Sequence, residues 1–95
     1  MEFFNCKINL VPTDVTIDDS VNAAYIRFCS RRVSATTDVT SDRAVILIDY
    51  DLIGNMVGIE IVGFDDVRSI LEEIGIQTSS IESSDRPSRS HKVTR

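Results

Sequence analysis

The chain has 95 residues, of which 42% are hydrophobic and 26% are charged. This length allows one hydrophobic core rather than two, and the composition is globular rather than disordered or disulfide-dense. No apolar run approaches the ~18 residues of a membrane helix, and residues 1–7 lack the pattern of a secretory signal. We therefore expect a cytoplasmic protein without a membrane span.

The net charge of −5 is unevenly divided along the chain. Residues 1–82 carry six Lys/Arg against fourteen Asp/Glu, a net −8, whereas residues 83–95 carry four Lys/Arg against one Asp, a net +3. An acidic body repels phosphate backbones, so only the basic tail could contact nucleic acid, weakly and without specificity. Nucleic acid is therefore not expected as the main ligand.

The residues that usually build catalytic or metal sites are scarce. Cys6, Cys29 and the single histidine, His91, are spaced too widely for a usual zinc site. A cytoplasmic chain keeps its thiols reduced, so we expect two free cysteines. Because these residues do not form a usual zinc site, we also expect no cofactor. The chain also lacks a nucleophile elbow and a glycine-rich phosphate loop, which argues against an enzyme.

The first half of the chain predicts strands. Residues 1–14 hold apolar side chains with partial alternation and could add a strand before Pro12 ends it. Residues 15–17 form a short strand, a polar turn follows, and residues 23–29 return as a second arm. Residues 32–39 alternate strictly, which predicts a third strand with one face in water.

The next two segments, 44–50 and 56–62, are apolar at nearly every position, as in strands covered on both faces. Residues 51–55 connect them as a hairpin of about five residues, in which Gly54 and Asn55 best tolerate positive φ. The register is left open. Without a known register, we assign Ile46, Ile48, Met56 and Val62 to one face of the sheet. The other face then carries Val45, Leu47, Val57, Ile59 and Ile61.

The period then changes to that of a helix. Apolar side chains recur at i, i+3, i+4 and i+7, namely Val67, Ile70, Leu71 and Ile74. Asp65 or Asp66 can cap the start of this helix, and Gly75 can end it. From Thr78 onward the chain is too polar to bury anything, so we expect one domain at residues 1–77 and a disordered basic tail at 78–95. The predicted class is α+β: a small, mainly antiparallel sheet of four to six short strands with one amphipathic helix near the C-terminus.

Two motifs carry a family resemblance across residues 15–62. Residues 22–26 read NAAYI, and residues 49–61 read DYDLIGNMVGIEI. With them the chain resembles DUF2283, a family of small bacterial proteins of unknown function. The resemblance implies an antiparallel β architecture and no reaction, and because some members sit beside toxin-like genes, it implies an antitoxin-like regulatory partner as one alternative. This chain departs from the family in having Ile17 for a common tyrosine, Asn22 for a common aspartate, and Leu52-Ile53 where the hairpin loop is usually acidic.

Three carboxylates form the main candidate site. Asp49 and Asp51 alternate at a strand end and Glu60 lies on the facing arm, so together they could hold Mg²⁺ or Ca²⁺ in a metal-binding protein or hydrolase. The structural alternative has Asp51 capping the turn, Asp49 binding loop amides and Glu60 pairing with Arg27. We favour the structural alternative, because a metal site needs more ligands than these.

A second candidate is a recognition patch on the second arm. Tyr25 and Arg27 share a strand face, and both residue types are enriched at interface hot spots. The apolar strands also present more surface than one helix can cover. We therefore expect a non-catalytic interaction module that self-associates as a homodimer or binds another small protein. If the N-terminal segment covers the second face of the sheet, the protein is instead a monomer.

Overall fold

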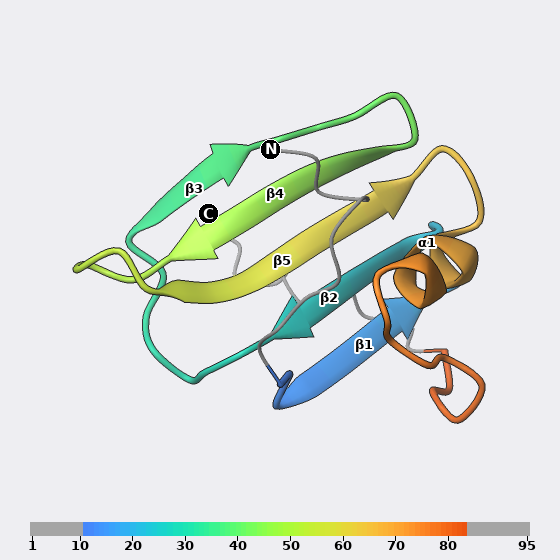
Figure 1. Ribbon diagram of the computed structural model, residues 1–95, viewed down its shortest axis with the longest axis horizontal. Coiled ribbons are helices and arrows are strands. Elements are labelled where there is room, and N and C mark those ends of the chain that lie inside the picture. The colour runs from blue at the N-terminus through green and yellow to red at the C-terminus, as the bar shows by residue number, and fades with distance from the viewer. Residues whose placement is uncertain (1–10, 84–95) are drawn as a thin grey trace.

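The computed structural model describes residues 11–83, which form five strands and one helix (Figure 1). In chain order these elements are β1 (Asp14–Asp18), β2 (Ala23–Arg27), β3 (Ala35–Asp38), β4 (Ala44–Tyr50), β5 (Met56–Gly63) and α1 (Val67–Glu73). The strand order across the sheet is β1-β2-β5-β4-β3, and every neighbouring pair is antiparallel. The predicted fold class is confirmed.

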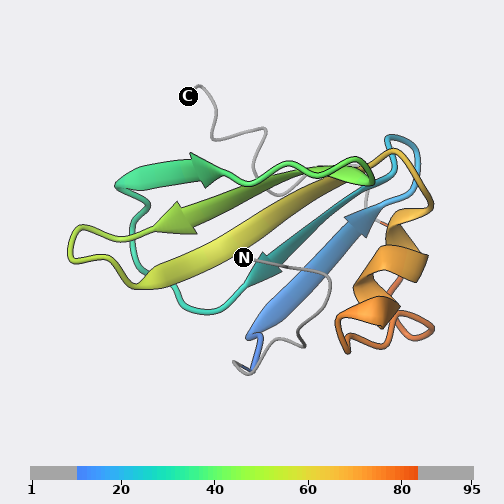
Figure 2. The same ribbon diagram turned by 45° about the horizontal axis from the view of Figure 1, so that its top comes forward.

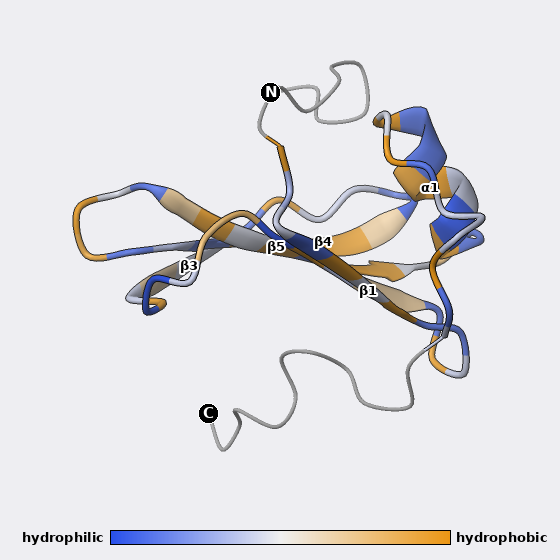
Figure 3. Ribbon diagram, turned by 90° about the horizontal axis from the view of Figure 1, so that it is seen from below, coloured by the Kyte–Doolittle hydropathy of each residue, from blue (hydrophilic) through white to orange (hydrophobic). Residues whose placement is uncertain are grey.

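A row of isoleucines defines the core face of the sheet. Ile59 on β5 lies opposite Ile26 on β2 and Ile48 on β4, and one step along the strands Ile61 lies opposite Ile46. The apolar residues of α1 belong to the same core cluster. Figure 3 shows α1 lying on one side of the sheet, over one end of it. The faces drawn without a register were therefore wrong, because Ile59 and Ile61 share a face with Ile46 and Ile48.

Strand β3 is shorter than the alternation predicts. It spans Ala35–Asp38, and all four residues are exposed. The backbone nevertheless follows β4 further in both directions: Ser34 N–H donates to Tyr50 O at 2.7 Å, and Val39 N–H donates to Ile46 O at 2.9 Å. Residues 34–39 therefore form one edge of the sheet. Only the middle four residues, Ala35–Asp38, pair regularly with β4.

The helix ends as predicted but begins differently. Gly75 has φ 99°, and Ile76 N–H donates to Leu71 O, so a left-handed glycine closes the C-terminus. At the start, Asp66 makes no side-chain bond to the helix amides, and its carboxylate accepts from Ser69 Oγ at 3.1 Å. The expected aspartate cap was wrong, because a residue from another turn, Asn22, occupies that position.

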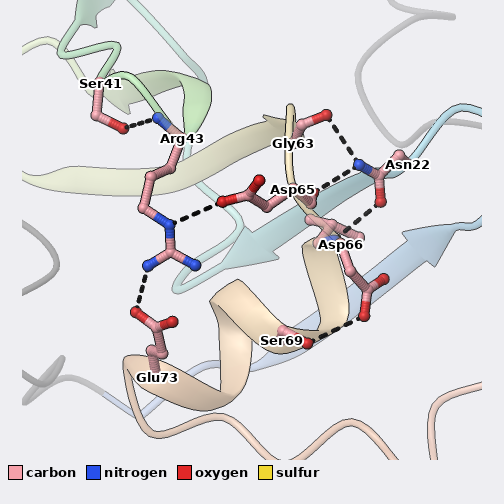
Figure 4. A network of polar contacts seen from close by, with 9 residues as sticks. Asn22, Ser41, Arg43, Gly63, Asp65, Asp66, Ser69 and Glu73 are labelled. Atoms are coloured by element: carbon pink, nitrogen blue, oxygen red, sulfur yellow. Dashed lines mark hydrogen bonds and ion pairs between the residues drawn. The ribbon is translucent and has the colours of Figure 1, made fainter.

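Asn22 clamps the helix to the sheet (Figure 4). Its Oδ1 accepts from Val67 N–H at 2.9 Å, and its Nδ2 donates to Gly63 O and Asp65 O, both at 2.8 Å. Asn22 is the described non-glycine residue with positive φ, 55°, a conformation that asparagine tolerates well. One side chain thus joins the β1–β2 turn to the β5–α1 connection.

A second contact ties the β3–β4 turn to the same end of the sheet. The Arg43 guanidinium donates to Asp65 at 3.2 Å and to Glu73 on α1 (Figure 4). The Arg43 side chain is 29% exposed, so these ion pairs are partly shielded from water. Three connections that are far apart in sequence therefore meet around α1.

The described segment after α1 packs on the domain. Thr78 is 3% exposed, and its Oγ1 donates to Glu72 at 2.8 Å. Ser83 forms a parallel bridge with Ile17 on β1, and its Oγ accepts from Asp19 N–H at 2.9 Å. The expectation that nothing after Gln77 is buried was therefore wrong for Thr78. The rest of the predicted tail and the N-terminal apolar residues, Phe3, Phe4, Ile8 and Leu10, lie outside the described residues.

Candidate functional site

The face opposite α1 carries a row of residues in register across four strands. Arg27 lies opposite Gly58, Gly58 opposite Asp49, and Asp49 opposite Thr36. Tyr25, two residues before Arg27 on β2, also projects onto this face, because side chains of one face recur at every second position of a strand. This face therefore brings together both residues of the predicted recognition patch and two of the predicted carboxylates, Asp49 and Glu60, with Glu60 directly opposite Tyr25.

The centre of the row is a buried carboxylate held by two hydroxyls. Asp49 is 1% exposed, accepts from Tyr25 Oη at 2.8 Å through Oδ2, and accepts from Thr36 Oγ1 at 2.6 Å through Oδ1. A buried carboxylate needs such donors, since an unsatisfied one is costly. We expected loop amides to bind Asp49; the donors in the structure are instead side chains of β2 and β3.

Gly58 makes this arrangement fit. The Tyr25 ring has to cross β5 to reach Asp49 on β4, and a Cβ at position 58 would lie 2.2 Å from Tyr25 Oη. Such a distance is far inside van der Waals contact, so only glycine leaves room for the ring. A glycine inside an otherwise apolar strand is the sequence signal for such a close approach, but the sequence alone does not reveal what approaches.

Tyr25 is therefore part of the interior, although it sits on the predicted patch. It is 4% exposed, and the guanidinium carbon of Arg27 lies 5.3 Å from its ring centroid. This distance is within cation–π range. Tyr25 and Arg27 share a face as the alternation predicts, and the tyrosine hydroxyl is turned to Asp49.

Asp51 organises the β4–β5 turn. Its Oδ1 accepts from the amides of Ile53 at 3.1 Å and Asn55 at 2.8 Å, and its Oδ2 accepts from Arg31 Nη1 at 2.9 Å. The Arg31 bond, helped by the bonds from Asn55 and Ile53, lowers the pKa of Asp51 to about 2. Asp51 thus caps the hairpin, as the structural alternative states.

The three predicted metal ligands do not converge. A register shift in the β4–β5 pairing falls between Asp49 and Tyr50, and Asp51 faces its own turn. Glu60 lies opposite Tyr25 on β2 and Leu47 on β4. Within residues 11–83, no group of three or more His, Cys, Asp or Glu side chains could hold a metal ion. The observed geometry supports a structural role for these carboxylates.

Acid should weaken the hairpin through Asp51. Its pKa is depressed in the folded state, so the stabilisation is complete above the unfolded pKa of about 4 and is lost as the pH falls toward 2. Urea unfolding followed by circular dichroism between pH 7 and pH 2 measures this loss. Asp51→Asn should be less stable at pH 7 and lose less stability with acid than the unchanged chain. An equal loss in both proteins would contradict this role of Asp51.

The two edges of the sheet differ in exposure. The outer edge of β1 is met by Ser83 through its bridge to Ile17. The outer edge of β3 has no described segment beyond it, and Figure 2 shows β3 on the side of the sheet away from α1 and β1. An unpaired strand edge can bind another extended chain. The alternating sequence of residues 32–39 predicted a strand but not its place at the edge.

Cys29 is a free, partly buried thiol, as expected, whereas Cys6 and His91 lie outside the described residues. Within residues 11–83, the helix of the fold is too short to cross a membrane.

Comparison with known proteins gives a family and nothing more specific. The model of DUF2283, a "protein of unknown function" family, matches residues 14–64, which run from β1 to the residue after β5. No curated protein and no solved structure matches the chain. The match covers the five strands and leaves out α1 and the segment after it. Since it spans more than half of the chain, this protein belongs to the DUF2283 family.

Proposed function

We propose that this protein is a cytoplasmic, non-catalytic interaction module that self-associates through the outer edge of β3. The observation that carries the proposal is the difference between the two sheet edges: Ser83 bridges the edge of β1, whereas no segment of residues 11–83 lies beyond the edge of β3. Asp49 and Asp51, two of the three candidate carboxylates, are engaged in structural bonds, which supports a binding rather than a catalytic role.

The backbone of β3 is oriented for such pairing. Val39 continues the register of β3, and its N–H points inward to Ile46 O. Ser34 N–H also points inward, to the Tyr50 O that lies opposite Ala35, so the regular alternation begins only at Ala35. Within the regular part of an antiparallel strand, inward and outward groups alternate. Thr36 and Asp38 therefore turn their amide and carbonyl groups to the outside of the sheet. Edge strands that avoid pairing usually carry proline, a bulge or charged side chains, above all lysine, whereas β3, with the sequence ATTD, has a single charge at its last residue.

A two-fold antiparallel arrangement suits these outward groups. If Thr37 lies on the axis, Thr36 of one copy faces Asp38 of the other, and each can donate and accept across the interface. This register also keeps the two Asp38 carboxylates from lying directly opposite each other, which would be unfavourable. Two sheets would then continue as one across the dimer.

The edge can be blocked by a single substitution. Asp38→Pro removes an outward N–H and leaves the inward bonds to β4, and proline is tolerated on edge strands. We expect full-length protein to show a rising average mass with concentration in light scattering on a sizing column, and Asp38→Pro to stay monomeric. Asp38→Ala is the matched control, because it loses the carboxylate but keeps the N–H, so it should still self-associate. A monomer at every concentration for the unchanged chain would refute the proposal.

A further inference from the structure

The β4–β5 hairpin and the β2–β3 loop enclose a hollow at the end of the sheet opposite α1. It has a volume of about 460 Å³ and is lined by Arg31, Arg32, Ser34, Asp51, Leu52 and Ile53. Figure 1 shows this hairpin at the far end of the sheet from the helix. The hollow lies next to the start of the open β3 edge, since Ser34 precedes Ala35.

The hollow combines exposed basic and apolar groups, of which only Arg31 has a described role in the fold. Leu52 is 86% exposed and Ile53 is 79% exposed, which is unusual for two large adjacent apolar side chains. Arg32 is exposed and forms no ion pair with any described residue, and the Arg31 side chain is 58% exposed beside Asp51. In contrast, Arg43 and Arg68 are engaged in ion pairs with carboxylates of the domain.

The charge of the Asp51 carboxylate does not cancel this basic character. It is already bound by two backbone amides, an amide side chain and the Arg31 guanidinium. Arg32 therefore remains available to an anion from outside, and guanidinium binds carboxylates through paired hydrogen bonds. On a body with a net charge of −8 over residues 1–82, this corner is a local exception.

We propose that the hollow binds the C-terminal residue of an extended peptide, with its carboxylate at Arg32 and an aliphatic side chain against Leu52 and Ile53. The direction of the chain fits this assignment. A peptide that pairs antiparallel with β3 runs from Asp38 toward Ser34, so its C-terminus arrives at the hollow. This binding rests on the β3 edge of the proposed function, where the peptide takes the place of the second copy, and adds the chemistry of the partner's last residue.

The test uses a free acid and its amide. The probe is an N-acetylated tetrapeptide, threonine-valine-threonine-leucine, prepared with a free carboxylate and with a C-terminal amide, and titrated into full-length ¹⁵N-labelled protein. We expect the free acid to shift the backbone amide signals of residues 31–36 and 52–53. The amide should bind about tenfold more weakly, because it cannot form the charged bonds to Arg32.

Variants separate this site from self-association. Arg32→Gln should bind both peptides equally weakly while its average mass still rises with concentration. Asp42→Asn, which removes an exposed charge away from the hollow, should keep the preference for the free acid. If the unchanged chain is monomeric but still prefers the free acid, self-association fails and the peptide site stands.

Two outcomes would overturn the peptide site. One is equal affinity of the unchanged chain for acid and amide. The other is the absence of binding of either peptide to the unchanged chain. If the protein then sediments on vesicles of phosphatidylcholine and phosphatidylglycerol and Ile53→Ser abolishes this, the apolar hairpin tip is assigned to a lipid surface.

Discussion

Gly58→Ala is expected to destabilise the protein by about 3 kcal/mol. The added Cβ would lie 2.2 Å from Tyr25 Oη and 2.5 Å from Cζ, so the ring has to leave its place across β5. Forcing a group into a packed site costs about 1–3 kcal/mol, and a buried polar group that loses its partner costs about 1–3 kcal/mol more. Urea unfolding at neutral pH followed by circular dichroism measures the difference.

Tyr25→Phe is the control for that experiment. It removes the hydroxyl that donates to Asp49 at 2.8 Å but keeps the ring on β5, so it should cost less than Gly58→Ala, about 1–2 kcal/mol. If Gly58→Ala is as stable as the unchanged chain, the ring does not lie across β5 and the described row is wrong.

Asn22→Ala should have a somewhat larger effect, about 4 kcal/mol. It removes the cap on Val67 N–H and the two bonds to Gly63 O and Asp65 O, and it places alanine at φ 55°. Loss of a cap costs about 1 kcal/mol, and each further bond and the left-handed backbone add about 1 kcal/mol. Thermal or urea unfolding measures the sum.

Asn22→Gly separates the side chain from the backbone. Glycine accepts positive φ without strain but makes none of the three bonds, so Asn22→Gly should be more stable than Asn22→Ala by about 1 kcal/mol. Equal stability of the two variants would show that the backbone conformation contributes nothing. No loss in either variant would contradict the clamp between the β1–β2 turn and α1.

Local patterns in the sequence predict the elements well. Alternation and β-branched residues indicate the strands, and the 3.6-residue period with Gly75 indicates α1 and its end, because these depend on neighbours in the chain. The register of β4 against β5 could not be read from the sequence, because both strands are apolar at almost every position. The faces of Ile59 and Ile61 were misassigned for that reason.

The contacts that define the candidate site depend on distant parts of the chain. Asp49 is bound by Tyr25 and Thr36, which come from strands on opposite sides of β4, and only the strand order brings them together. The cap on α1 likewise comes from Asn22, not from the nearby aspartates. Thr78 was expected in a tail, but Glu72 and Arg68 give its polar groups partners in the folded protein.

The most direct test of the proposed function is amide hydrogen exchange along β3 at several protein concentrations. If β3 edges pair, the outward N–H groups of Thr36 and Asp38 become protected as the concentration rises, whereas the inward N–H of Val39 is protected throughout. Fast exchange of Thr36 and Asp38 at every concentration, in a protein whose average mass increases, would place the interface elsewhere and contradict pairing through β3.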